Sequence, residues 1–290
     1  MNILISLQVD GEVTVERVQE LFQENVMTKR SDNGEMVYKR LQHFWTSFLG
    51  YKFWEHDKNF LVSNHIRLYD DKDNLTIKDP CTRTDLEGML EKLVQRPWRE
   101  NQSLWEILII NNFVPENPSS KLQTIVILRM DHVLGDGYSI LGFLKLLLNG
   151  TCSVPQIGQN KRSFSIWQNP GLVFKIPYDF TKDMLAMTLG AKMYGQLGNP
   201  DNVVSISSQV SVSLVKEIKN QYKVSYGAVL HSVVLGAIAR AFHSADLSPP
   251  KYLQCSFPIP VPGHPGGMVI HTVSVFAELP CDAPSPSIRL

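Results

Sequence analysis

The feature that most constrains the fold is a pair of apolar, β-rich runs followed at once by a polar loop and a leucine-rich segment. The runs are "LWEILIINNF" (104–113) and "KLQTIVILRM" (121–130), and a loop-forming "VPENPSS" separates them. The second run leads into "DHVLGDG" (131–137), and the following "YSILGFLKLLLN" is typical of a mostly buried helix. This order predicts a strand, a loop and a helix, with titratable side chains held at the junction.

Further helices and strands are predicted on both sides of this unit. Thr84 and Glu87 form a capping-box pattern at the start of a helix that Pro97 ends, and Thr14 can cap an earlier helix. The remaining predicted elements are a strand over 60–70, helices over 213–222 and 225–242, and strands over 252–261 and 268–279. Mixed strands and helices in two successive groups indicate an α/β protein with two lobes.

Length and composition agree with a two-lobed chain. The 290 residues are 43% hydrophobic, which is enough for a large core. A stretch rich in glycine, proline, serine and asparagine follows residue 150, so we expect a first lobe at 1–150, a crossover linker at 151–200 and a partial second lobe at 201–290. Both ends look unfinished, and a fragment or short isoform is expected.

Charge and cysteine usage exclude several classes of protein. The 28 basic and 28 acidic residues cancel and form no basic stripe, so nucleic acid is not an expected partner. The four cysteines have no metal-type spacing and are too few for a disulfide scaffold, which suits a reducing compartment. No apolar run reaches the roughly 20 residues of a spanning helix, and the N-terminus does not resemble a signal peptide.

The polar loop at 131–137 carries the candidate site. If the strand persists to His132, its side chain shares a face with Met130, while Asp131 points to the opposite face. A histidine presented beside an apolar slot suits a general base, because free imidazole titrates near neutrality. Gly137 lets the chain turn sharply, and Asp136 can cap the next helix or pair with a distant arginine.

Two other interpretations of this loop stay open on the local pattern. His132 can be an ordinary loop histidine and Asp136 an ordinary turn residue, and for an isolated match this is the favoured interpretation. A metal site formed by Asp131, His132 and Asp136 is less favoured, because nothing nearby in the sequence completes a set of ligands.

A resemblance to a known family changes this balance. The loop resembles the HHxxxDG motif of CoA-dependent acyltransferases. "NHIRL", "LWEILIINNF" and the motif strand, with the later "SYGAVLHSVVLGAIARAF" and "GMVIHTVSVFAELP", resemble the wax ester synthase/diacylglycerol acyltransferase family over roughly residues 50–290. The resemblance implies a two-lobed, chloramphenicol acetyltransferase-like architecture, with the second lobe incomplete at the C-terminus and the N-terminal portion shortened.

The resemblance also implies roles for individual residues. His132 falls on the second histidine of the motif, the family's catalytic base, and Asp136 with Gly137 falls on the DG pair, where the aspartate usually pairs with an arginine. Trp105 and Glu106 match a Trp-Glu pair typical of the family. Asp131 departs from the pattern, because it occupies the slot of the first histidine, which normally braces the loop. A second departure is Gly227-Ala228 in place of the family's Asn-Asp.

The function implied is O-acyl transfer from fatty acyl-CoA to diacylglycerol or a long-chain alcohol. Acyl-CoA is a co-substrate, no cofactor is needed, and a peripheral membrane surface on the cytosolic side of the endoplasmic reticulum or plasma membrane is the expected location. The alternative is a catalytically impaired relative that binds acyl chains or a partner protein. Among the other histidines, we expect His65 to be structural, His231 to lie in the core, and His264 and His271 to face solvent.

Overall fold

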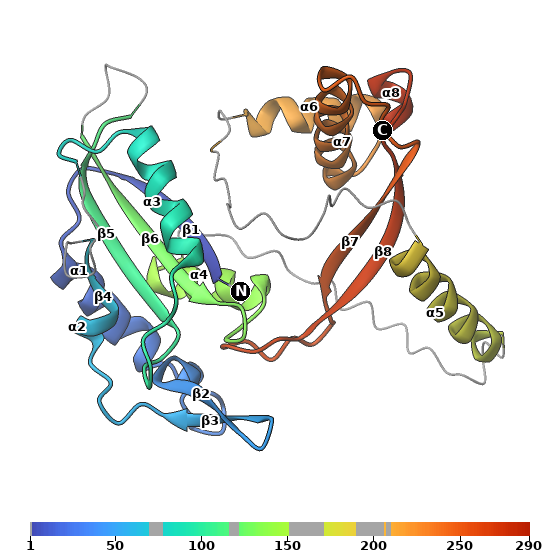
Figure 1. Cartoon of the computed structure of the whole chain (residues 1–290). Helices are drawn as coiled ribbons and strands as arrows, with labels where there is room; N and C mark the ends of the chain where they lie inside the picture. Colours follow the sequence, from blue (N-terminus) through green and yellow to red (C-terminus); the bar gives the residue numbers. More distant parts are fainter. Residues whose placement is uncertain (1, 70–77, 116–121, 151–170, 190–205, 207–209) are drawn as a thin grey trace. The chain divides into compact units, whose positions relative to one another are not determined.

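The computed structural model describes residues 2–69, 78–115, 122–150, 171–189, 206 and 210–290 (Figure 1). The chain divides into two compact units. Unit 1 comprises Met1–Gly158, Pro200–Ile206 and Pro260–Thr272, and unit 2 comprises Gln159–Asn199, Ser207–Ile259 and Val273–Leu290. Most of the linker expected at 151–200 lies outside the described residues.

Unit 1 is built on a four-stranded sheet in the order β1-β6-β5-β4. Its strands are β1 (Asn2–Asp10), β4 (Ile66–Leu68), β5 (Trp105–Phe113) and β6 (Gln123–Asp131). β6 pairs antiparallel with β1 and β5, and β4 pairs parallel with β5, so the sheet is mixed. The two runs predicted as strands are confirmed as β5 and β6. Because β6 has a neighbour on each side, the loop that follows it starts from the interior of the sheet.

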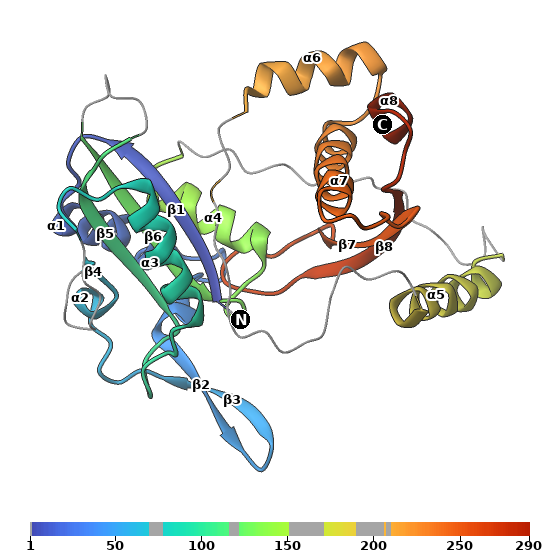
Figure 2. The ribbon, with the colours of Figure 1, turned by 45° about the horizontal axis from the view of Figure 1, so that its top comes forward.

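One face of the sheet is covered by α1 (Val15–Leu21), the π-helical η1 (Phe22–Met27) and α4 (Gly137–Leu147) (Figure 2). Thr14 caps α1, as predicted, and Phe22 stacks on Trp105 of β5 with ring centroids 4.9 Å apart. The core on this face joins side chains of the helices to those of the central strands; its fully buried members include Phe22, Ile107, Leu128, Met130 and Phe143.

The other face is covered by α3 (Arg83–Gln95), whose Leu86 and Leu93 pack with Leu108 and Ile127 of the sheet. The capping box at its N-terminus differs from the predicted one. The cap is Thr82 with Asp85, two residues before the predicted Thr84 and Glu87. Both pairs fit the pattern. The earlier one forms because Cys81 is bridged to Phe113, so the chain is fixed to the sheet just before the helix begins.

The segment between η1 and β4 contains elements that the sequence pattern did not predict. A 3-10 turn, η2 (Lys39–Gln42), precedes a hairpin of β2 (His43–Phe48) and β3 (Tyr51–His56), which forms a separate two-stranded sheet. The strand predicted over 60–70 is confirmed only at β4, because the residues before it form the short helix α2 (Val62–His65).

Unit 2 consists of helices and one hairpin, with a small core around Leu235, Ala239, Leu253 and Cys281. Its elements are α5 (Leu172–Leu189), α6 (Val212–Tyr222), α7 (Tyr226–Ser244), β7 (Tyr252–Pro260), β8 (Thr272–Pro280) and α8 (Pro286–Arg289). His231 is exposed on α7 and packs against Phe257, so its predicted core position was wrong; it lies one turn before Leu235 on the same side of the helix, beyond the end of the small core. Of the helices described, none alone is long and apolar enough to cross a membrane, although α6 and α7 together, bent by 105°, meet that test of length and composition.

The connection between β7 and β8 differs from the predicted division into lobes. Residues 260–272 fall in the range expected for the second lobe, yet they belong to unit 1. The strand predicted from Met268 begins only at Thr272, because the preceding residues make hydrogen bonds to the loop after β6 instead of to a neighbouring strand.

Candidate functional site

The candidate site begins where β6 leaves the sheet. Met130 points into the core beneath α4, and Arg129 points to the opposite face, as the predicted alternation requires. β6 ends at Asp131, and His132 is the first residue of the turn that follows. The alternation therefore holds along the strand, while the direction of His132 is set by the turn.

Asp131 fixes the first half of the loop. Its carboxylate accepts a hydrogen bond from the backbone N–H of Val133 at 2.9 Å, and its backbone carbonyl accepts one from Leu134 at 3.0 Å. The first of these bonds is an Asx turn, in which an aspartate side chain stabilises the backbone two residues further on. The residue in the first-histidine slot therefore makes loop-stabilising contacts of its own.

Asp136 fixes the second half of the loop. It is the N-cap residue of α4, and its Oδ1 accepts a hydrogen bond from the Ser139 backbone N–H at 2.9 Å. Its Oδ2 accepts one from the His271 backbone N–H at 2.8 Å, and the His264 ring lies 3.2 Å from the same oxygen. The carboxylate is thus enclosed by donors from α4 and from residues 260–272.

The partner of Asp136 corrects two expectations. The resemblance implied an arginine, and the structure places His264 there, with its side chain only 1% exposed instead of facing solvent. The Gly266 backbone N–H donates to Nδ1 of His264 at 3.0 Å, which requires an unprotonated Nδ1. The ring proton therefore lies on Nε2, from which it is donated to the carboxylate of Asp136.

Burial and hydrogen bonding act in opposite directions on the pKa of Asp136. Burial of the carboxyl group, the largest single influence, raises the pKa. The hydrogen bonds from the His271 and Ser139 backbones and from His264 together outweigh it, so the pKa lies below its ordinary value. Asp136 is therefore a carboxylate at neutral pH and acts as an acceptor at the start of α4.

Close backbone packing joins the loop to residues 260–272. The Asp136 N–H and the Ser139 hydroxyl both donate to the carbonyl of Val269, at 3.1 and 2.8 Å. A Cβ on Gly135 would lie 3.0 Å from Cβ of Ser139, so only glycine fits there without a shift. Gly267 has a φ of +69°, and a Cβ there would lie 2.7 Å from the Val37 carbonyl oxygen. These contacts hold the second half of the loop in one position.

His132, the predicted base, is half-buried within this rigid loop. Its ring has no hydrogen bond to any residue in the described ranges, and the carboxylate of Asp136 is directed toward His264 and His271 instead. The described residues also contain no group of three or more His, Cys, Asp or Glu side chains placed to hold a metal ion. The loop thus presents one imidazole, with both flanking aspartates engaged in loop structure.

A buried charge cluster lies on β4, β5 and β6 behind the loop. Glu106 pairs with Arg129 at 2.8 Å and with Arg67 at 3.2 Å, and the side chains of Glu106 and Arg129 are 10% and 2% exposed. Beside it, the His65 ring stacks on Trp105 with centroids 4.7 Å apart, and its Nδ1 lies 2.7 Å from the Trp105 carbonyl oxygen. The structural role predicted for His65 is confirmed, and burial lowers its pKa, which favours the neutral ring.

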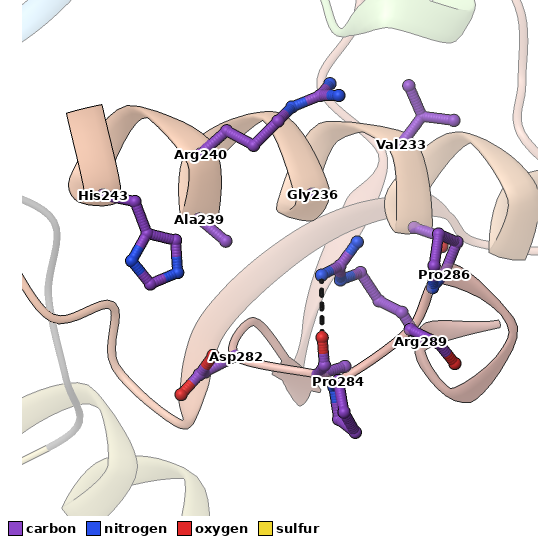
Figure 3. Close-up of a pocket in the computed structure, with 12 residues that line it drawn as sticks. Val233, Gly236, Ala239, Arg240, His243, Asp282, Pro284, Pro286 and Arg289 are labelled. Atoms are coloured by element: carbon purple, nitrogen blue, oxygen red, sulfur yellow. Dashed lines mark hydrogen bonds between the residues drawn. The ribbon is translucent and has the colours of Figure 1, made fainter.

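One cavity borders the charge cluster, and a larger one lies apart from it in unit 2. A cavity of about 20 Å³ borders His65, Glu106 and Arg129, which is room for a single water at most. A larger cavity of about 430 Å³ lies within unit 2, between α7 and residues 282–289 (Figure 3). Its wall includes Arg289, whose guanidinium lies against Gly236 where a Cβ would overlap it (Figure 3). None of the predicted site residues lines either cavity.

The fold defined by this sheet, its helices and the loop after β6 is found in known structures. The chain is similar to the wax ester synthase/diacylglycerol acyltransferase from Marinobacter aquaeolei VT8, with a TM-score of 0.58 and 15% identity over 100% of this chain and 64% of that one. It is also similar to the first condensation domain of the calcium-dependent antibiotic synthetase, with a TM-score of 0.56 and 12% identity over 99% and 67%. A third similar structure is the epimerization domain from the third module of tyrocidine synthetase B, with a TM-score of 0.53 and 10% identity over 99% and 64%.

These similarities confirm the predicted fold class. The chain has the α/β fold of the condensation domains and acyltransferases, the chloramphenicol acetyltransferase-like architecture. It spans about two thirds of the length of these structures. No protein-family model and no curated protein sequence matches the chain.

Sequence reasoning did not find His264 and His271 as parts of the site. They flank the turn-forming "PGG", and this local pattern indicates only a loop between two strands. Asp136 and His264 lie 128 positions apart, and no local pattern reports such a contact.

Proposed function

We propose that the chain is an acyltransferase that moves a fatty acyl group from acyl-CoA to the hydroxyl of a diacylglycerol or a long-chain alcohol. The observation that carries the proposal is the position of His132. It follows the central strand β6 directly, in a loop stabilised on one side by Asp131 and on the other by Asp136, within a fold shared with acyltransferases. The choice of lipid acceptors rests on the motif resemblance and on the named activity of one similar structure.

The proposed reaction needs one base and no covalent intermediate on the protein. His132 takes the proton from the acceptor hydroxyl as its oxygen attacks the thioester carbon. A C–O bond forms and gives a tetrahedral intermediate. As the intermediate collapses, the C–S bond breaks, and the CoA thiolate takes the proton from the imidazolium. Acyl-CoA is already activated, so holding both substrates in reacting positions supplies much of the acceleration. Because both acceptors are lipids, we place the reaction at a membrane surface on the cytosolic side.

The test measures release of CoA thiol from palmitoyl-CoA with and without a lipid alcohol or diacylglycerol. We expect release only with an acceptor, and His132→Ala should lower it by about 10²–10⁴-fold, the usual contribution of a general base. His243→Ala is the matched control, because this histidine is exposed at the end of α7, and it should keep full activity. Equal rates for His132→Ala and the unsubstituted chain would remove His132 from the mechanism.

One observation favours a second candidate, a binding protein without catalysis. The His132 ring has no partner in the described ranges to fix its tautomer, whereas an efficient general base is usually held by a second group. This candidate expects acyl-CoA to bind without any release of CoA, even with acceptor present. Asp131→His separates the two candidates further, since restored activity would assign the defect to the first-histidine slot.

A further inference from the structure

The hairpin of β2 and β3 projects from the rest of unit 1 in both views (Figures 1 and 2). Its tip is apolar, with Phe48, Leu49 and Tyr51 exposed by 66%, 82% and 73%. No charged residue occurs between Thr46 and Tyr51. Exposed single apolar residues are common on soluble proteins, but adjacent ones at a protruding tip indicate a contact surface.

The leucine at this tip occupies a turn position that disfavours leucine. Leu49 and Gly50 form a two-residue turn with φ values of +50° and +80°. Two-residue hairpin turns with positive φ at both positions favour asparagine, aspartate or glycine, because a larger side chain is disfavoured in the left-handed region. Leu49 is therefore unfavourable both for the backbone of the turn and for its exposure to water. Such a residue is expected where its side chain meets another surface.

Each face of the hairpin carries aromatic side chains. Phe48 lies opposite Tyr51, and Phe53, on the same face, is 51% exposed. The other face carries the cross-strand pair Trp45 and Trp54, whose rings are half-buried and pack in part against the core of unit 1. Each tryptophan has a cation over its ring: the Lys52 ammonium lies 3.6 Å from the Trp45 centroid, and the Arg40 guanidinium carbon lies 5.1 Å from the Trp54 centroid.

These groups follow an order along the hairpin. The uncharged tip comes first, the tryptophan pair lies about 13 Å behind it at roughly 3.3 Å per residue, and the cations lie over that pair. At the interface of a lipid bilayer, aromatic side chains and cations likewise lie together at the level of the headgroups, behind the apolar groups that reach the hydrocarbon. Residues 39–58 carry four Lys or Arg and two Asp or Glu, in a chain whose total charge is zero. Lys39 is paired with Glu35, so the excess that remains to meet anionic headgroups is one positive charge, from Arg40, Lys52 and Lys58 against Glu55 and Asp57.

We propose that the tip of this hairpin inserts into the surface of a lipid bilayer that contains anionic lipids. The apolar groups lie at the convex end of a narrow ribbon, which suits insertion into a soft interface better than burial against a flat protein face. The inference does not depend on the reaction proposed above, because it concerns binding to a surface and not turnover.

The test is sedimentation of the full chain with vesicles, without acyl-CoA or acceptor. One set of vesicles is phosphatidylcholine alone and the other is phosphatidylcholine mixed with phosphatidylserine. Leu49→Asn should lower the partition onto both by about tenfold or more, since it removes a fully inserted leucine side chain. The same substitution should leave the melting temperature unchanged or raise it, because asparagine suits this turn. Lys52→Ala should weaken binding to the anionic vesicles only.

Leu122→Asn is the matched control, since Leu122 is an exposed leucine of unit 1 away from the hairpin, and it should bind vesicles like the unsubstituted chain. Unchanged partition of Leu49→Asn would overturn the proposal, as would absence of binding by the unsubstituted chain to both vesicle types. A change in oligomeric state with Leu49→Asn, at unaltered vesicle binding, would instead assign the tip to a contact between copies of the chain. A chain that releases no CoA but still sediments with vesicles would separate failure of the proposed reaction from failure of this inference.

Discussion

Replacing Asp136 with asparagine tests the interlock between the motif loop and residues 260–272. The carboxylate accepts the Ser139 N–H on one oxygen and the His271 N–H on the other, at 2.9 and 2.8 Å. Asparagine has one acceptor oxygen, so whichever way the amide is turned, its NH₂ group faces one of these two donors. A buried N–H without an acceptor costs about 1–3 kcal/mol. Loss of the negative charge weakens the remaining bond and the His264 contact by roughly 1 kcal/mol more.

The free energy of unfolding should therefore fall by about 2–4 kcal/mol, which lowers the melting temperature by about 5–15 °C for a chain of this size. Urea unfolding followed by circular dichroism measures the change, and Asp32→Asn is the control because Asp32 is exposed on the same unit. A change smaller than about 0.5 kcal/mol would refute the argument, since that is the range of ordinary surface substitutions. Acyl transfer should fall together with stability. Lost activity at an unchanged melting temperature would instead assign Asp136 a direct part in the chemistry.

Three further predictions concern the pH dependence of the Asp136 contacts, the close approach at Gly267 and the buried pair of Glu106 and Arg129. Because the pKa of Asp136 is lowered in the folded state, its carboxylate stabilises the fold above the ordinary carboxyl pKa, and this stabilisation is lost as pH falls through the folded-state pKa. The difference in urea midpoint between the unsubstituted chain and Asp136→Asn should therefore shrink below about pH 4. A difference that stays constant with pH would contradict this. Gly267→Ala should destabilise by about 1–3 kcal/mol in the same assay, since its Cβ would meet the Val37 carbonyl at a positive φ, and an unchanged midpoint would show that the approach is looser. Glu106→Gln should lower stability by about 3 kcal/mol because Arg129 then keeps a buried charge without its anion, and the double variant with Arg129→Met should recover most of the loss if that reasoning is right.

The parts of the fold that sequence predicted well are those with long, uninterrupted apolar runs. β5, β6 and α4 each bury nearly every inward position, so their periodicity is clear and Asp136 is recognisable as a cap. The start of α3 was placed two residues late because Thr82 and Thr84 are each followed by an acid three positions on. The bridge from Cys81 to Phe113, a tertiary contact, selects the first pair.

The parts that could not be predicted depend on contacts between distant residues. The hairpin of β2 and β3 mixes aromatic, polar and charged residues on both faces, so it lacks the alternation of a half-buried strand. The candidate site was predicted only in its local half. His132 and Asp136 come from one loop, but the histidines that enclose the Asp136 carboxylate come from residues 260–272, and their positions follow from the path of the chain after β7.

The long separation between Asp136 and His271 has a consequence during protein synthesis. The ribosome adds the acceptor 135 residues before the donor, so at about 5–20 residues per second the two are separated by roughly 7–27 s. All four strands of the sheet are synthesised before that interval, and α4 follows at its start. For the rest of the interval the carboxylate at the start of α4 has only its own helix as a donor. The motif loop can therefore reach its final form only after residues 260–272 have left the ribosome. A nascent chain that is halted before these residues would have the sheet and α4 but an incomplete site.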